Sequence, residues 1–209
     1  MQKKIQQVAI GIFVFMLGIG FSRFGEAGEP LELVRAGVDK AVQILKDPKF
    51  QSQDKKKERV DLLRETLNPI FDYQEMAKRA LGTHWRRRTA AEQEEFVKLF
   101  RDFLERIYSD KIDLYGGEKV RFGREVLDKD FAQVESTIVK PKGEEIAVTY
   151  KLRQINGQWK VYDAVVENIS IVNNYRSQFD RIISSSSYEE LVKRLQEKNG
   201  VDRARQASS

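Results

Sequence analysis

Residues 145–170 read EIAVTYKLRQINGQWKVYDAVVENIS and hold the clearest structural pattern in the chain. Apolar residues at 146, 148, 150 and 152 alternate with more polar ones, which is typical of a half-buried β-strand. The pair Asn156-Gly157 predicts a tight hairpin, because both residues tolerate the positive φ angles that such a turn needs. The strand after it, residues 159–167, is apolar on both faces. We expect its two faces to carry, respectively, Trp159, Val161 and Val165, and Tyr162, Ala164 and Val166.

Upstream of this hairpin, residues 120–126 and 131–140 also have the composition of strands, and Pro141-Lys142-Gly143 predicts the turn between two of them. Residues before 116 and after 170 instead show helical spacing. Predicted helices begin near Pro30, Lys56, Asp72, Thr89, Ile171 and Ser187. A block of helices followed by an antiparallel meander predicts an α+β fold. Its helical N-terminal half packs on a curved sheet of four to five strands.

The helix that begins after Thr89 carries the strongest periodic signal. Thr89 and Glu92 have the spacing of a capping box, which stabilises a helix start. Apolar residues then recur every three or four positions from Phe96 to Tyr108, and we expect Gly116-Gly117 to close the segment. Such a stripe fits either an ordinary core or the wall of an apolar cavity, and spacing alone does not separate the two.

The N-terminus has the layout of a secretory signal peptide. Lys3 and Lys4 precede an apolar run from Val8 to Phe21, which is shorter than the about 20 residues of a membrane span. Small residues at Gly25 and Ala27 predict cleavage near Ala27, and hence export to the periplasm. We expect one domain at residues 28–200, with a helical subdomain at about 56–115 and a sheet at about 118–168. Residues 201–209 are expected to form a polar tail.

The amino-acid composition excludes several kinds of functional site. The chain has no cysteine, which excludes disulfides, thiol catalysis and metal–thiolate centres. Its one histidine, His84, excludes a multi-histidine metal site and has no orienting partner evident in the sequence. No phosphate-binding glycine loop or nucleophile elbow is present. We therefore expect no metal and no cofactor, and the net charge of +5 alone does not indicate nucleic acid binding.

Two polar features leave alternatives open. Asp163 lies in an apolar strand near Tyr150 and Tyr162, so it could serve as an acid or base on an isomerase-like cone. The favoured interpretation is that Asp163 accepts hydrogen bonds at a sheet edge or helix junction. The run Arg86-Arg87-Arg88 is either a solvated surface or a contact for phosphate headgroups or an acidic partner.

Several segments resemble one family. They are Asn68-Pro69 with Phe71–Tyr73, residues 80–85 (ALGTHW), residues 89–93 (TAAEQ), residues 157–170 (GQWKVYDAVVENIS) and residues 173–179 (NNYRSQF). In these segments the chain resembles the MlaC family, also called the toluene-tolerance family, of periplasmic phospholipid-binding proteins. The resemblance covers nearly all of the chain after the signal peptide.

This resemblance implies an NTF2-like cone in which the sheet and its helices enclose an apolar lipid pocket. It implies a soluble, monomeric carrier without catalytic activity. The carrier shuttles a diacyl phospholipid between an outer-membrane lipoprotein complex and an inner-membrane ABC transporter complex with MCE domains. A sister branch associated with hopanoid export makes a polycyclic lipid the alternative ligand.

The resemblance also implies that apolar side chains from these elements line the pocket, with about half of the candidates serving as plain core. The expected lining residues are Trp85, Phe96, Leu99, Phe100, Phe103, Leu104, Ile107, Tyr108, Val148, Tyr150, Val161, Val165, Ile169, Ile171, Tyr175 and Phe179. Arg86, Arg87 and Arg88 are expected to contact the headgroup or a partner protein.

Overall fold

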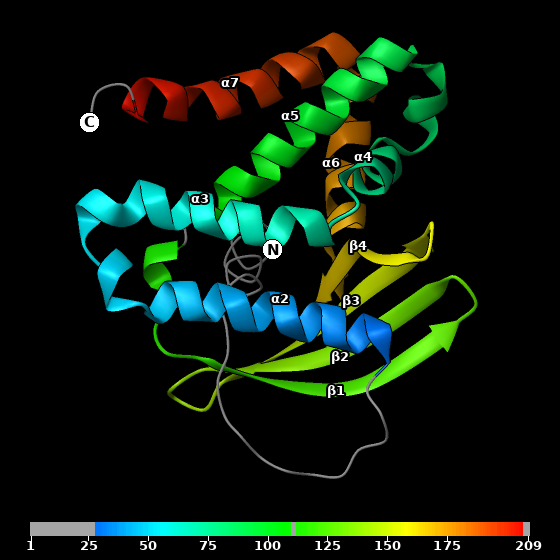
Figure 1. The fold of residues 1–209 in the computed structure, drawn as a ribbon. Coiled ribbons are helices and arrows are strands. Elements are labelled where there is room, and N and C mark those ends of the chain that lie inside the picture. The colour runs from blue at the N-terminus through cyan, green and yellow to red at the C-terminus, as the bar shows by residue number, and fades with distance from the viewer. Residues whose placement is uncertain (1–27, 110–111, 207–209) are drawn as a thin grey trace. The chain divides into compact units, whose positions relative to one another are not determined.

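The computed structural model describes residues 28–109 and 112–206 (Figure 1). The predicted signal peptide, residues 1–27, lies outside this range. Contacts divide the described chain into a sheet unit, residues 28–72 and 109–170, and a helical unit, residues 73–108 and 171–206. This division differs from the predicted helical subdomain at 56–115. Residues 56–72 of that range group with the sheet, whereas residues 171–206, outside that range, belong to the helical unit.

The sheet unit contains five antiparallel strands in the order of the sequence, as the meander predicted. Its strands are β1 (Lys119–Asp128), β2 (Phe131–Val139), β3 (Glu145–Ile155), β4 (Gln158–Val166) and β5 (Ile169–Ser170). Asn156 and Gly157 have φ angles of 50° and 79°, so the predicted tight turn is confirmed. A second such turn at Glu167 and Asn168, with φ angles of 46° and 65°, reverses the chain into β5.

A bulge in β4 changes which residues share a face of the sheet. Lys151 pairs with Asp163 whereas the next residue, Leu152, pairs with Val161, so Tyr162 is an extra residue in β4. Beyond it the alternation shifts by one position. Val165 therefore lies on the opposite face from Val161, and the prediction that these two residues share a face is wrong.

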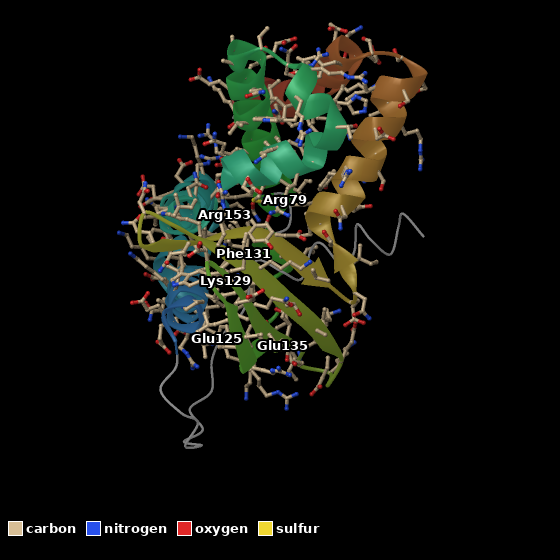
Figure 2. All side chains as sticks on the ribbon, turned by 90° about the vertical axis from the view of Figure 1, so that its right-hand side faces the viewer. Arg79, Glu125, Lys129, Phe131, Glu135 and Arg153 are labelled. Atoms are coloured by element: carbon tan, nitrogen blue, oxygen red, sulfur yellow. The ribbon has the colours of Figure 1, made fainter. Side chains whose placement is uncertain are left out.

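The inner face of the sheet is covered by α2 (Glu29–Lys46), which packs on β1, β2 and β4. The start of α2 at Gly28 has no side-chain cap of its own. Glu125 of β1 supplies one, because its Oε2 accepts a hydrogen bond from the Leu31 amide at 2.8 Å (Figure 2). A bulge between Phe122 and Glu125 turns this carboxylate towards the helix.

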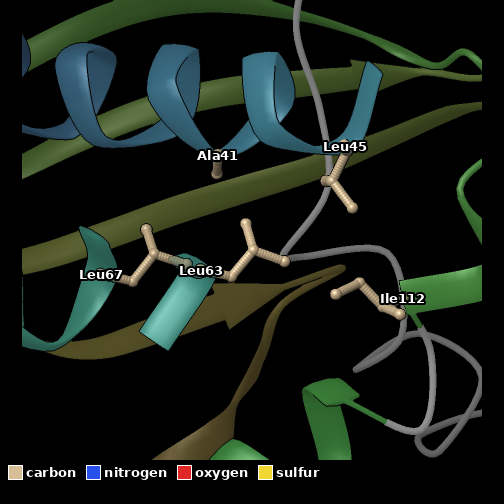
Figure 3. Packing of buried hydrophobic residues seen from close by; sticks show 5 residues of the cluster. All are labelled: Ala41, Leu45, Leu63, Leu67 and Ile112. Atoms are coloured by element: carbon tan, nitrogen blue, oxygen red, sulfur yellow. The ribbon is translucent and has the colours of Figure 1, made fainter. Parts of the chain in front are cut away.

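Next to α2 lies α3 (Lys56–Leu67), at the boundaries that the sequence predicts. The two helices share a buried aliphatic cluster with the short 3₁₀ turn Ile112–Leu114, as Figure 3 shows. Further 3₁₀ turns at Pro48–Phe50, Gln53–Lys55 and Asn68–Ile70 join the elements. The cluster consists of Ala41, Leu45, Leu63, Leu67 and Ile112.

Buried charged side chains connect the loops of the sheet unit to its helices and strands. Arg59 donates from Nη1 to the Phe50 carbonyl at 3.1 Å and from Nη2 to Asp113 Oδ1 at 2.5 Å. Arg153 of β3 donates from Nε to Asp72 Oδ2 at 2.5 Å (Figure 2). Because Arg59 and Asp72 are both buried, each needs its partner to offset the loss of hydration.

The helical unit contains α4 (Tyr73–Leu81), the 3₁₀ helix η4 (Gly82–Arg87), α5 (Ala90–Ser109), α6 (Ile171–Ser185) and α7 (Tyr188–Gln206). The capping box at α5 is confirmed: the Thr89 amide donates to Glu92 Oε2 at 2.7 Å and the Glu92 amide donates to Thr89 Oγ1 at 3.3 Å. The helix ends at Ser109, before the glycine pair expected to close it. At the other end of the chain α7 continues to Gln206, into the segment expected to be a polar tail.

Candidate functional site

The inner face of the sheet brings together four of the predicted lining residues. Val148 pairs with Val166, which in turn pairs with Ile169, so all three share one face. Tyr150 and Val161 lie on the same face, and Val148, Tyr150 and Val161 are buried whereas Ile169 is half-buried. Burial raises the pKa of Tyr150 to about 12, although a hydrogen bond with Ser136 partly opposes the shift. This part of the face is therefore apolar and uncharged at neutral pH.

Val165 is the exception among the predicted lining residues of the sheet unit. It pairs with Thr149 and Ser170 on the outer face, where Lys151 and Asp163 also lie. A regular alternation along β4 would place it beside Val161, and only the bulge at Tyr162 moves it away.

The helical unit contains an aromatic cluster, which we define as Phe96, Phe100, Phe103, Tyr175, Phe179 and Tyr188. Ring centroids of neighbouring members are 5.3–6.4 Å apart, within the range of favourable aromatic pairs. Phe96 and Phe100 are fully buried. The cluster joins α5, α6 and α7, so much of the aromatic stripe predicted on one helix contacts other rings.

Tyr188 is a member of this cluster that the sequence analysis did not select. Its hydroxyl donates to the Glu92 carbonyl at 3.1 Å, which links the start of α7 to the start of α5. The signal was present in the sequence: Tyr188 precedes the apolar residues Leu191 and Leu195 by three and seven positions, which is helical spacing.

The other predicted lining residues of the helical unit differ in how far their side chains are buried. Leu104 is buried, whereas the remaining members with described side chains are half-buried. These half-buried residues are Trp85, Leu99, Ile107 and Ile171. The side chain of Tyr108 lies outside the described part of the structure.

The polar residues considered for catalysis do not form one site. Asp163 is buried on the outer face of the sheet, where its Oδ2 accepts a hydrogen bond from Ser170 Oγ at 2.7 Å and lies 3.9 Å from Lys151 Nζ. Tyr150 points to the inner face, so the two side chains are separated by the sheet itself. The favoured interpretation of Asp163, a hydrogen-bond acceptor next to a sheet edge, is confirmed.

His84 has a partner that the sequence did not reveal. Its Nε2 lies 2.8 Å from Asp180 Oδ1 on α6, almost a hundred positions further along the chain. The sequence did not show this partner because it comes from α6, which folds back beside η4 within the helical unit. In the described part of the chain, no cluster of three metal-ligating side chains is present.

The three consecutive arginines have different surroundings. Arg88 stacks over the Tyr188 ring, 4.5 Å from its centroid, and pairs with Glu92 at 3.3 Å. Arg86 and Arg87 are exposed and make no ion pair with any described residue. Only these two are available for a headgroup or a partner.

Comparison with known proteins places the fold in a family. The sequence matches the family model described as MlaC protein over residues 35–197. The chain belongs to the MlaC family. The resemblance inferred from the sequence motifs is thereby confirmed.

Two characterised relatives support this membership. An intermembrane phospholipid transport system binding protein MlaC from Haemophilus influenzae is 24% identical over 141 residues, which cover 65% of this chain and 66% of that protein. The toluene tolerance protein ttg2D of Pseudomonas putida is 25% identical over 155 residues, covering 73% of this chain and 72% of that protein. This chain thus spans just under two thirds of the Haemophilus relative.

A solved structure confirms the α+β architecture. It is a phospholipid-binding protein from Ralstonia solanacearum in complex with a phospholipid. It aligns with a TM-score of 0.70 and 24% identity over 83% of this chain and 98% of that one. Within residues 28–109 and 112–206, no helix is long and apolar enough to cross a membrane.

Proposed function

We propose that this MlaC-family chain is a phospholipid carrier of the periplasm, without catalytic activity. It shields the acyl tails of a diacyl phospholipid and passes the lipid between an outer-membrane lipoprotein complex and an inner-membrane ABC transporter complex with MCE domains. The observation that carries this proposal is the family match over residues 35–197.

Physical chemistry explains why such transport needs a protein. Each methylene removed from water contributes about 0.8 kcal/mol, so exposing one long acyl tail costs on the order of 10 kcal/mol. A carrier must therefore offer a dry apolar surface to the tails while the headgroup stays in water. In the sheet unit, the proposed lining residues are the inner-face residues Val148, Tyr150, Val161 and Ile169. In the helical unit, the proposed lining residues are Trp85, Phe96, Leu99, Phe100, Phe103, Leu104, Ile107, Tyr108, Ile171, Tyr175 and Phe179.

The charge distribution supports this choice. The inner-face residues are aliphatic apart from Tyr150, and the raised pKa of Tyr150 keeps its phenol neutral. Burial also raises the pKa of Tyr175 to about 12. No charge from these two groups would oppose an acyl tail. The enzyme alternative lacks comparable support, because Tyr150 and Asp163 lie on opposite faces.

The first test is native mass spectrometry of the protein purified from the periplasm, followed by lipid extraction under denaturing conditions. A mass excess that resolves into diacyl phospholipid supports the carrier. A hopanoid or other polycyclic lipid moves the chain to the sister branch. A bare protein that takes up no lipid from phospholipid vesicles would refute the proposal and favour a binding adaptor.

A matched pair of substitutions tests the lining. Ile169 and Val165 are both half-buried, but they lie on opposite faces of the sheet. Ile169→Trp should lower the amount of bound lipid because the larger ring occupies space on the inner face. Val165→Trp should leave bound lipid unchanged. Equal effects of the two substitutions would remove the inner face from the proposed site.

A further inference from the structure

Three exposed arginines lie on two neighbouring elements of the helical unit. Arg86 and Arg87 project from η4, and Arg176 of α6 lies against the start of the same turn. A Cβ atom added at Gly82 would lie only 2.7 Å from Arg176 Nε. We call Arg86, Arg87 and Arg176 the arginine patch.

The backbone of the patch is held in place from two sides. The side-chain Nε2 of Gln93 on α5 donates to the carbonyls of Trp85 and Arg88, at 3.1 and 3.2 Å. His84 joins η4 to α6 through Asp180. Since a 3₁₀ helix repeats every three residues, Arg87 lies on the same side of η4 as His84, and Arg86 lies on the next side. The backbone that carries Arg86 and Arg87 is therefore braced against α5 and α6.

Acidic groups of the same unit already have other partners. Glu75 pairs with Lys78 and Arg79, and Glu92 pairs with Arg88. Asp180 pairs with His84. Within the described chain, no acidic side chain forms an ion pair with any member of the arginine patch. The surface has positive charge without an internal counterion, and each guanidinium can bind a phosphate through two hydrogen bonds.

We propose that the arginine patch docks this protein on the surface of a bilayer that contains anionic phospholipids. Guanidinium groups match the phosphates that such a surface presents as a continuous array. The inference deepens the proposed carrier function, because it assigns one step, contact with the donor or acceptor membrane, to residues outside the proposed lining.

Vesicle flotation tests the proposal. The protein purified from the periplasm is mixed with vesicles of phosphatidylethanolamine and phosphatidylglycerol, or with vesicles of phosphatidylcholine alone. Each cation near an anionic surface strengthens binding by roughly fivefold, so R86Q/R87Q/R176Q should weaken binding to the anionic vesicles by about a hundredfold. Binding of the unmodified protein should fall as salt rises, because ions screen the attraction.

The control variant K40Q/K46Q/K142Q has the same change in net charge. All three lysines are exposed residues of the sheet unit, and none forms an ion pair with a described residue. This variant should keep most of its vesicle binding. Equal losses in the two triple variants would overturn the docking proposal, because net charge would then explain both. A third variant, R86K/R87K/R176K, should bind anionic vesicles more strongly than the glutamine variant.

Native mass spectrometry of the same variants separates docking from lipid carriage. The proposal requires R86Q/R87Q/R176Q to keep its bound lipid while losing vesicle binding. If bound lipid is lost as well, the arginines contact the carried headgroup and docking is overturned. Unchanged vesicle binding together with a loss of transfer to a protein acceptor would also overturn it, in favour of an acidic protein partner. Inorganic phosphate at matched ionic strength should not displace the vesicles, and displacement would indicate a simple phosphate site.

Discussion

The two units of this protein build their interiors from different side chains. The buried residues of the sheet unit are mostly aliphatic, and its buried charges Arg59, Asp72 and Asp163 tie loops and strands together. The interior of the helical unit includes six aromatic rings in mutual contact. Each ring makes a large share of the packing contacts in the helical unit. The stability of the helical unit should therefore depend on a few residues, and that of the sheet unit on many.

The largest expected effect comes from the centre of the aromatic cluster. Phe100 is fully buried and contacts four other rings, so Phe100→Ala should lower the free energy of unfolding by about 4 kcal/mol. Val134→Ala, at a fully buried site of the sheet unit, should cost about 2 kcal/mol. Urea unfolding of lipid-free protein measures both. If the Phe100 variant were no less stable than the Val134 variant, the ring contacts of Phe100 would contribute little to the stability of the lipid-free protein.

Removal of the carboxylate that pairs with buried Arg59 should have the next largest effect on stability. Asp113→Ala leaves Arg59 without its carboxylate and should cost roughly 2 kcal/mol, as expected for hydrogen bonds to a charged group. The more accessible pair of Asp61 with Arg64, both half-buried, provides the control, and Asp61→Ala should cost at most about 0.5 kcal/mol. Similar losses would mean that burial of Arg59 does not set the strength of its pair.

A smaller effect is expected at the β5 edge. Ser170→Ala removes a hydrogen-bond donor from buried Asp163 and should cost about 1 kcal/mol in urea unfolding. Ser177 is an exposed helical serine whose hydroxyl donates to the Asn173 carbonyl, so Ser177→Ala should change stability by less than about 0.5 kcal/mol. If Ser170→Ala leaves the free energy of unfolding unchanged, the other contacts of Asp163 are sufficient to stabilise its buried carboxylate.

The smallest effect concerns acid. The Thr89 amide and hydroxyl, followed by Arg88, hold the pKa of half-buried Glu92 below its usual 4.5. Because the folded-state pKa is lowered, this carboxylate stabilises the helical unit above pH 4.5 and loses that contribution as pH falls through its folded pKa. Glu92→Gln should therefore make unfolding less sensitive to pH between about 6 and about 3. Glu94→Gln, at an exposed position of the same helix, should leave the profile unchanged, and a matching change there would contradict the capping explanation.

Much of the local structure could be predicted because it depends on neighbours in the sequence. The strands, the Asn156-Gly157 turn, the Lys56–Leu67 helix and the capping box at Thr89 all follow from short-range spacing and backbone preferences. Family motifs also identified the family, since they are read directly from the residues.

The remaining features needed the tertiary structure, because they depend on residues far apart in the chain. Pairing with Lys151 and Leu152 shows the bulge at Tyr162, which sends Val165 to the outer face. Helix α6 lies beside η4 although the two are far apart in the sequence. It places Asp180 next to His84 and Arg176 next to Gly82. Sequence periodicity determined which residues are apolar, whereas packing decided which face each one occupies and which arginines lack an acidic partner.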